Sequence, residues 1–101
     1  MIFTQTWNRI KTIAMEKIKE MQDALFTYVK DNTFKDVSNL TSDTMLFVEG
    51  IFDSMGFALL LDFLETTFKI TTEDSDLVEE NFESIDAIIA FVQKKSPSLV
   101  D

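Results

Sequence analysis

The sequence contains no cysteine and no histidine. Without cysteine, the chain can form neither a disulfide framework nor a thiolate metal site. Without histidine, it lacks the commonest general base, the commonest transition-metal ligand and the base of Ser-His and Cys-His nucleophile pairs. Catalysis by this chain alone would have to run on carboxylates or lysines, so we expect neither an enzyme nor a metal-binding protein.

Glycine and proline are also scarce, with two glycines and one proline in 101 residues. Such a chain has few positions for tight turns or sharp breaks. Hydrophobic residues make up 46% of the chain and include ten phenylalanines and five methionines, enough to bury a core in one small domain. These proportions favour a few packed helices over a strand-rich barrel.

Positive charge is scarce outside the N-terminal third. Residues 1–30 carry five cations and three acids, the remaining residues carry four cations and fifteen acids, and the net charge is −9. The acidic body argues against nucleic acid as a partner. It favours a basic surface on another protein, because complementary fields speed encounter, although solubility alone explains the charge equally well.

The sequence also lacks a long hydrophobic run. The longest run near the middle, residues 57–61, stops at Asp62 and is far too short to span a membrane. The N-terminus lacks the basic region, apolar run and cleavage site of a secretory signal. We therefore expect a cytoplasmic protein that does not bind membranes.

Three stretches show apolar residues at helical spacing. They are residues 4–30, 54–68 and 84–94, and Ser84 is a suitable N-cap for the last one. The positions expected to face the core are Trp7, Ile10, Ala14, Ile18, Met21, Leu25 and Tyr28 in the first stretch, Phe57, Leu60, Leu61, Leu64 and Phe68 in the second, and Ile85, Ile88, Ile89 and Val92 in the third.

The connecting segments have no sustained period. Residues 31–50 are expected to form a long ordered loop, and residues 71–83 leave room for one short turn of helix near 76–80. The tail, residues 96–101, is expected to fray. The sequence therefore predicts an all-α bundle of three main helices and one short helix. The side chains expected to hold the long loop against the core are Phe34, Val37, Leu40, Met45, Leu46 and Phe47.

Asp53 and Ser54 stand at the predicted start of the second helix. Serine and aspartate are ordinary helix-start residues, so capping alone explains the pair. The alternative is that the Ser54 hydroxyl is modified, because a helix N-terminus offers unpaired N–H groups and a partial positive charge that favour an attached phosphate. With no histidine to activate the hydroxyl, another enzyme would have to catalyse the attachment.

The second helix has a further apolar face beside Ser54. Met55, Ala58, Leu59 and Asp62 lie away from the stripe expected to be buried. The N-terminal helix or the long loop could cover Met55 and Leu59. The alternative is a docking patch for partner proteins, in which a flexible methionine fits several surfaces.

The order of these features resembles the acyl carrier proteins and their peptidyl carrier relatives. The likeness covers roughly residues 15–95 and is carried by "LFVEGIFDSMG", then "FALLLDFLETTFKI", then "EDSDLVEENFESIDAIIAFV", over residues 46–92. The Asp-Ser pair alone is weak evidence for this family, whereas the whole set of motifs in this order is more specific evidence. The residues that match best are the pair Asp53-Ser54, Leu64-Glu65 and Phe68 to Ile70 at the helix end, Asp76-Leu77, Asn81-Phe82 and Ser84-Ile85.

The resemblance implies a four-helix acyl-carrier-like bundle over residues 15–95, preceded by an N-terminal extension, residues 1–14. It implies that Ser54 is the attachment point for 4′-phosphopantetheine, which a magnesium-dependent phosphopantetheinyl transferase moves from coenzyme A, and that Asp53 assists recognition by that enzyme. The thiol of the group would carry an acyl or aminoacyl thioester from a loading enzyme to downstream synthases. In such proteins the core between the helices can shelter an acyl chain. Separately, we expect this protein to be a monomer.

The sequence departs from the family pattern around the serine. Met55-Gly56 follows Ser54 where fatty-acid carriers have a leucine and an acid, and this pair is more similar to D-alanyl carriers and free-standing carriers of specialised pathways. Leu59 replaces a typical acid, and Lys69 a typical glycine. Three interpretations stay open: a fatty-acyl carrier, a D-alanyl or other aminoacyl carrier, and an unmodified helical interaction module.

Overall fold

Three α-helices dominate the computed structural model, which describes the backbone of residues 2–95 and the side chains of residues 15–95. They are α1 (Ile2–Asp31), α2 (Ser54–Phe68) and α3 (Ile85–Lys95). Two short 3-10 turns, η1 (Asp74–Asp76) and η2 (Glu79–Asn81), lie between α2 and α3, and residues 2–95 contain no strand. The all-α prediction is confirmed, and two 3-10 turns stand where one short helix was expected.

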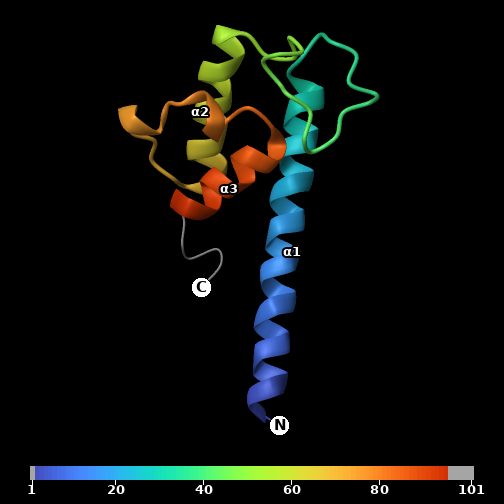
Figure 1. Ribbon diagram of the computed structural model, residues 1–101, viewed down its shortest axis with the longest axis vertical. Helices are drawn as coiled ribbons and strands as arrows, with labels where there is room; N and C mark the ends of the chain where they lie inside the picture. Colours follow the sequence, from blue (N-terminus) through green and yellow to red (C-terminus); the bar gives the residue numbers. More distant parts are fainter. Residues whose placement is uncertain (1, 96–101) are drawn as a thin grey trace.

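The helix α1 is much longer than the others, and its N-terminal half extends beyond the rest of the fold (Figure 1). The long loop and the start of α2 lie at the same end of the molecule as the C-terminal end of α1. The expected extension, residues 1–14, continues into α1 from Ile2 onward without a break. The side chains of Trp7, Ile10 and Ala14 and the expected tail, residues 96–101, lie outside the described part.

The core lies where α2 and α3 pack beside the C-terminal half of α1. Leu60 and Leu64 of α2 are fully buried, with Phe57, Leu61 and Phe68 half-buried around them, as the apolar stripe predicted. The remaining buried apolar residues are Met21, Leu25 and Val29 of α1, Ile85, Ile88, Ile89, Phe91 and Val92 of α3, and Leu46, Phe52, Ile70 and Phe82 of the connecting segments.

The start of α3 is tied to the long loop by backbone hydrogen bonds. Ser84 caps the helix as predicted, because its Oγ accepts a hydrogen bond from the N–H of Ala87 at 3.1 Å. The N–H of Leu46 donates to the Glu83 carbonyl at 2.8 Å, and the N–H of Asp86 donates to the Ser42 carbonyl at 2.9 Å. These contacts give the loop a fixed place on the bundle.

One loop prediction is wrong: Phe34 does not pack on the core but is fully exposed. The hydroxyl of its neighbour Thr33 donates a hydrogen bond to the Ile51 carbonyl at 2.8 Å, and this contact turns Thr33 inward and leaves Phe34 outside. The prediction holds for Leu46, which is buried, and for Val37, Leu40 and Phe47, which pack partly buried against the core, whereas Met45 is half-buried.

Across residues 2–95, no helix is both long enough and apolar enough to traverse a lipid bilayer.

Candidate functional site

The start of α2 is built around the side chain of Asp53. Asp53 is the N-cap in an extended conformation, and its Oδ1 accepts a hydrogen bond from the N–H of Gly56 at 2.9 Å. Its carbonyl accepts the first intrahelical hydrogen bond, from the N–H of Phe57 at 2.9 Å. The capping interpretation of the Asp-Ser pair is therefore confirmed for Asp53 and does not extend to Ser54.

Ser54 is the first residue of α2 and is exposed. Within residues 15–95, its hydroxyl takes part in no hydrogen bond. The N–H groups of Ser54 and Met55 belong to the first turn and have no intrahelical acceptor. The hydroxyl therefore stands free at the partly positive end of a helix, where an attached phosphate would meet unpaired N–H groups.

The outer face of α2 is open to solvent. Met55 and Leu59 are 72% and 54% exposed, and Ala58 and Asp62 are exposed as well. Among residues 15–95, neither α1 nor the long loop covers this face, so the predicted exposure is confirmed. The docking role of the four residues stays a prediction.

Packing against Phe52 explains why residue 56 is a glycine. A Cβ atom built at this position would lie 3.1 Å from Cδ1 and 3.2 Å from Cβ of Phe52. Phe52 is buried, and its ring lies so close to the first turn of α2 that a Cβ atom at position 56 would require it to shift by a few tenths of an ångström. The Met55-Gly56 pair, taken from the sequence as a clue to the cargo, is thus explained in part by packing within the chain.

A hollow of about 480 Å³ opens directly beside Ser54. We call it the Ser54 hollow. The ring of Phe57 stands between two of its other rings, with centroids 5.7 Å from Phe47 and 5.2 Å from Phe82. The walls are mostly apolar, and the charged groups among the described lining residues are both carboxylates. The lining residues are Phe47, Phe52, Phe57, Leu77, Val78 and Phe82, together with Asp53, Ser54 and Glu79.

Leu77, Val78 and Glu79 were not assigned to the site from the sequence. Leu77 and Val78 are 43% and 45% exposed, although both are large and apolar. The sequence did offer one signal that could have identified them. Leu77 and Val78 form an apolar pair within an otherwise acidic stretch, and such a pair is unusual for a solvated loop. Their role as one wall of the Ser54 hollow depends on the path of the segment after α2, which the local pattern does not specify.

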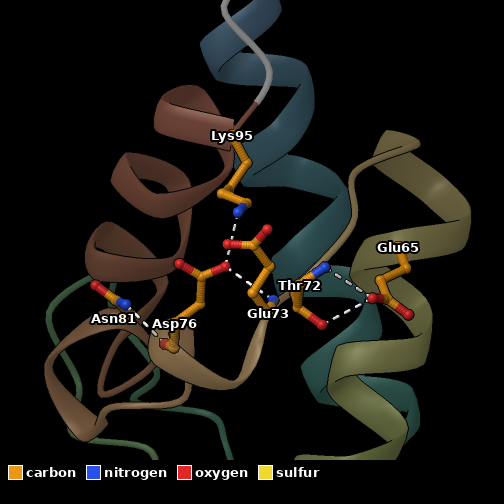
Figure 2. A network of polar contacts seen from close by, with 6 residues as sticks. All are labelled: Glu65, Thr72, Glu73, Asp76, Asn81 and Lys95. Carbon is orange, nitrogen blue, oxygen red and sulfur yellow. Dashed lines mark hydrogen bonds and ion pairs between the residues drawn. The ribbon is translucent and has the colours of Figure 1, made fainter.

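An ion pair fixes that path by joining the end of α3 to the turn η1 (Figure 2). Nζ of Lys95 lies 2.7 Å from Oδ2 of Asp76, and the two side chains are 20% and 13% exposed. The same carboxylate accepts a hydrogen bond from the N–H of Glu73 at 3.0 Å. The hydrogen bond from Lys95, followed by that from Glu73, lowers the pKa of Asp76, and the Asp76 contact raises the pKa of Lys95.

Two further pairs of residues, shown in Figure 2, hold the segment between α2 and α3 on either side of η1. Nδ2 of Asn81 donates to the Asp76 carbonyl at 2.8 Å. At the end of α2, Oε2 of Glu65 accepts hydrogen bonds from the N–H of Thr72 at 2.9 Å and from its hydroxyl at 2.7 Å. These two bonds, with the backbone bond as the larger cause, lower the pKa of Glu65.

A second Asp-Ser pair, Asp74-Ser75, offers an internal comparison. Ser75 is also exposed, but it lies in the three-residue turn η1 rather than at the start of an α-helix. It lines neither the Ser54 hollow nor any other hollow described here. Among the described residues, no cluster of three or more acidic side chains is arranged to hold a metal ion.

A comparison with protein-family models finds no match for this chain, and a search of curated proteins finds no relative. The function is therefore inferred from the sequence pattern and from the geometry at Ser54.

Proposed function

We propose that the protein is a carrier that bears 4′-phosphopantetheine on Ser54 and presents thioester-linked acyl groups to partner enzymes. The single observation that carries the proposal is the free, exposed hydroxyl of Ser54 at the N-terminus of α2, beside an apolar hollow. Asp53 supplies the helix cap, so the hydroxyl has no structural task in the described part of the chain.

The residues at this position suit the proposed group. The Ser54 hydroxyl would attack the phosphorus bonded to the pantetheine oxygen of coenzyme A, lose its proton to a base of the transferase, and displace adenosine 3′,5′-bisphosphate. The resulting phosphodiester would lie next to the unpaired N–H groups of the first turn of α2, which favour negative charge. Once attached, the group supplies the thiol that a chain without cysteine lacks.

The arrangement of helices agrees with the finer fold that the resemblance implies. The elements follow one another in the order of a four-helix carrier bundle: the long α1, the long loop, α2, a short irregular helical segment and α3. In this proposal, η1 and η2 take the place of the short helix, and residues 2–14 of α1 form the extension ahead of the carrier domain.

The lining of the Ser54 hollow favours an uncharged, apolar acyl cargo over a small amino acid. Burying a hydrocarbon chain there would contribute roughly 0.8 kcal/mol per methylene group, and the hollow offers four phenylalanine rings for it. Because Asp53 and Glu79 are the charged residues in the described part of the lining, a cargo ending in a carboxylate would be repelled. The glycine that favoured an aminoacyl cargo has the packing explanation given above.

An unmodified helical interaction module is the second candidate. It is favoured by the exposed Met55 and Leu59, which would serve a binding surface without any cofactor. The two candidates differ in one respect, because only the carrier requires a covalent group on Ser54.

Intact-mass measurement separates the candidates. The protein is incubated with coenzyme A, magnesium and a promiscuous phosphopantetheinyl transferase, with a known carrier as positive control. The proposal expects a gain of one phosphopantetheine group in the wild type and in Ser75→Ala, and no gain in Ser54→Ala. An unchanged wild-type mass, while the control carrier is modified, would leave the interaction module as the better candidate.

A further inference from the structure

One cation of the acidic body, Lys35, lies at the end of the molecule that carries Ser54. The four cations that follow residue 30 are Lys35, Lys69, Lys94 and Lys95. Lys69 stands at the opposite end of α2 from Ser54, and Lys94 and Lys95 close α3. Lys35 belongs to the long loop, which lies at the same end of the molecule as the start of α2 (Figure 1). Lys35 is therefore the first of the four to consider as a partner for a negative group attached to Ser54.

The backbone of Lys35 is held against the segment that leads into α2. Its N–H donates to Oγ1 of Thr33 at 3.2 Å, and that hydroxyl donates to the Ile51 carbonyl at 2.8 Å. The side chain runs along Gly50, because a Cβ atom built there would lie 3.5 Å from Cε and 3.7 Å from Nζ of Lys35. Within residues 15–95, the ammonium group forms no ion pair. The charge is thus brought to this segment without being neutralised by a described carboxylate.

Lys35 lines a second hollow, of about 510 Å³, which we call the Lys35 hollow. Both neighbours of Ser54 line it, Asp53 on one side and Met55 on the other, whereas Ser54 itself lines the Ser54 hollow. The serine therefore stands between two hollows. The described residues that line the Lys35 hollow are Asn32, Thr33, Phe34, Lys35, Gly50, Ile51, Phe52, Asp53, Met55, Gly56 and Leu59.

The two hollows differ in charge. The described lining of the Lys35 hollow holds one ammonium group and one carboxylate, those of Lys35 and Asp53, whereas the Ser54 hollow holds the carboxylates of Asp53 and Glu79. Lys30, in the last turn of α1, is in neither lining. A phosphodiester is negatively charged, so Lys35 would attract it and Glu79 would repel it. The charge of the prosthetic group therefore favours the Lys35 hollow.

The rest of the Lys35 hollow also matches the chemistry of pantetheine. Pantetheine alternates methyl groups with hydroxyl and amide groups. The lining offers apolar surface from Phe34, Met55 and Leu59 and polar groups from Asn32 and Thr33, which can exchange hydrogen bonds with a hydroxyl or an amide. A mixed lining of this kind suits the arm better than it suits a purely hydrocarbon cargo.

We infer that Lys35 pairs with the phosphodiester on Ser54 and that the pantetheine arm lies in the Lys35 hollow while no cargo is attached. This inference rests on the proposed function and assigns Lys35 as a positioning residue for the prosthetic group. An apolar cargo would draw the end of the arm toward the Ser54 hollow instead. Ser54 would then separate a resting site for the free arm from a hollow for the cargo.

The test compares each protein before and after loading with phosphopantetheine. Lys35→Gln removes the charge and keeps much of the side-chain stem. Lys69→Gln is the matched control, because Lys69 is also exposed and the substitution changes the net charge equally, at the far end of α2. Intact mass verifies that loading is complete, and circular dichroism verifies that both variants are folded. Two-dimensional NMR then gives the change in each backbone N–H chemical shift on loading.

In the wild type, loading should shift the N–H resonances of Thr33, Lys35 and Gly50 and leave those of Leu77 and Val78 nearly unchanged. Lys35→Gln should lose most of the change at Thr33 and Gly50, whereas Lys69→Gln should keep it. The change should also shrink as salt rises, because exposed charge pairs are screened. Loading should raise the melting temperature of the wild type, since an arm bound to the folded state stabilises it, and should raise that of Lys35→Gln less.

The possible failures are distinguishable. If intact mass shows that the wild type is never loaded, the proposed function fails and this inference fails with it. If the wild type is loaded but the shifts appear at Leu77 and Val78 instead, or are the same in Lys35→Gln, the inference about Lys35 alone is overturned. It is also overturned if the shifts depend on protein concentration and sedimentation shows a dimer, because a second copy then covers the Lys35 hollow.

Discussion

The carboxylate of Asp53 accepts a hydrogen bond from the backbone N–H of Gly56 at 2.9 Å, and this contact makes Asp53, rather than Ser54, the N-cap of α2. The two neighbours therefore have different tasks. Asp53 satisfies a backbone donor of the first turn, and Ser54 keeps its hydroxyl free.

Replacing Asp53 by alanine should lower the free energy of unfolding by about 1 kcal/mol, because the cap is lost. Asp53→Asn should keep nearly all of the stability, since an amide oxygen can accept the same hydrogen bond. Urea denaturation at neutral pH measures both variants. Equal stability of the alanine variant and the wild type would mean that the cap does not form.

Replacing Gly56 by alanine should also lower the free energy of unfolding. In an open helix, alanine is more favourable than glycine by roughly 1 kcal/mol. Here the new Cβ would lie 3.1 Å from Cδ1 of the buried Phe52, and the resulting strain should exceed that gain.

The control for Gly56→Ala is Ala58→Gly, at an exposed position of the same helix. This variant should show the ordinary loss of roughly 1 kcal/mol. A stabilised Gly56→Ala protein would show that Phe52 can move aside, and the packing explanation of the glycine would then be wrong.

Replacing Lys69 by glycine should stabilise the protein. Lys69 ends α2 in the left-handed region, with φ 55° and ψ 43°. A residue with a Cβ atom costs roughly 1–2 kcal/mol in this conformation, and glycine avoids that cost. Glycine also makes the unfolded chain more flexible, which offsets part of the gain. We therefore expect the free energy of unfolding to rise by about 0.5 kcal/mol.

The matched control for Lys69→Gly is Lys69→Ala, which removes the charge but keeps the Cβ atom. It should leave the denaturation midpoint nearly unchanged. If alanine and glycine stabilise equally, the effect comes from charge and not from backbone strain.

The Asp76–Lys95 ion pair should give stability a defined pH dependence. Because the pKa of Asp76 is lowered in the folded state, its contribution is present above the ordinary carboxyl value of 3.8 and is lost as pH falls through the lowered pKa. Because the pKa of Lys95 is raised, its contribution is present below 10.5 and is lost as pH rises through the raised value.

The measurement compares thermal unfolding of the wild type and Asp76→Asn across this range. Between about pH 4 and pH 10 the wild type should have the higher melting temperature. The difference in melting temperature between the two proteins should become smaller below about pH 4 and above about pH 10. A difference that does not change below pH 4 would show that the charge of Asp76 is not what stabilises the turn.

Helix positions and buried stripes could be predicted from the sequence because they depend on local periodicity. The second helix was predicted at residues 54–68 and is found at Ser54–Phe68, and the predicted inner face of α3 is buried throughout. One missed core residue, Phe91, lies at the edge of that face, where the pattern alone does not distinguish core from boundary.

The surroundings of Ser54 could be predicted only in part. The exposure of Met55 and Leu59 followed from the helical period, which assigns each residue to one face. The outward position of Phe34 did not, because it depends on the contact between Thr33 and Ile51, eighteen residues apart. The wall formed by Leu77 and Val78 likewise depends on the ion pair that joins Asp76 to Lys95.

The most direct test of the account is to locate the attached group on the chain. After reaction with coenzyme A and a transferase, the protein is digested and the modified peptide is fragmented in a mass spectrometer. The account predicts phosphopantetheine on Ser54 alone, with none on Ser75 of the second Asp-Ser pair. A group found on any other residue, or no group on a folded protein while a control carrier is fully modified, would contradict it.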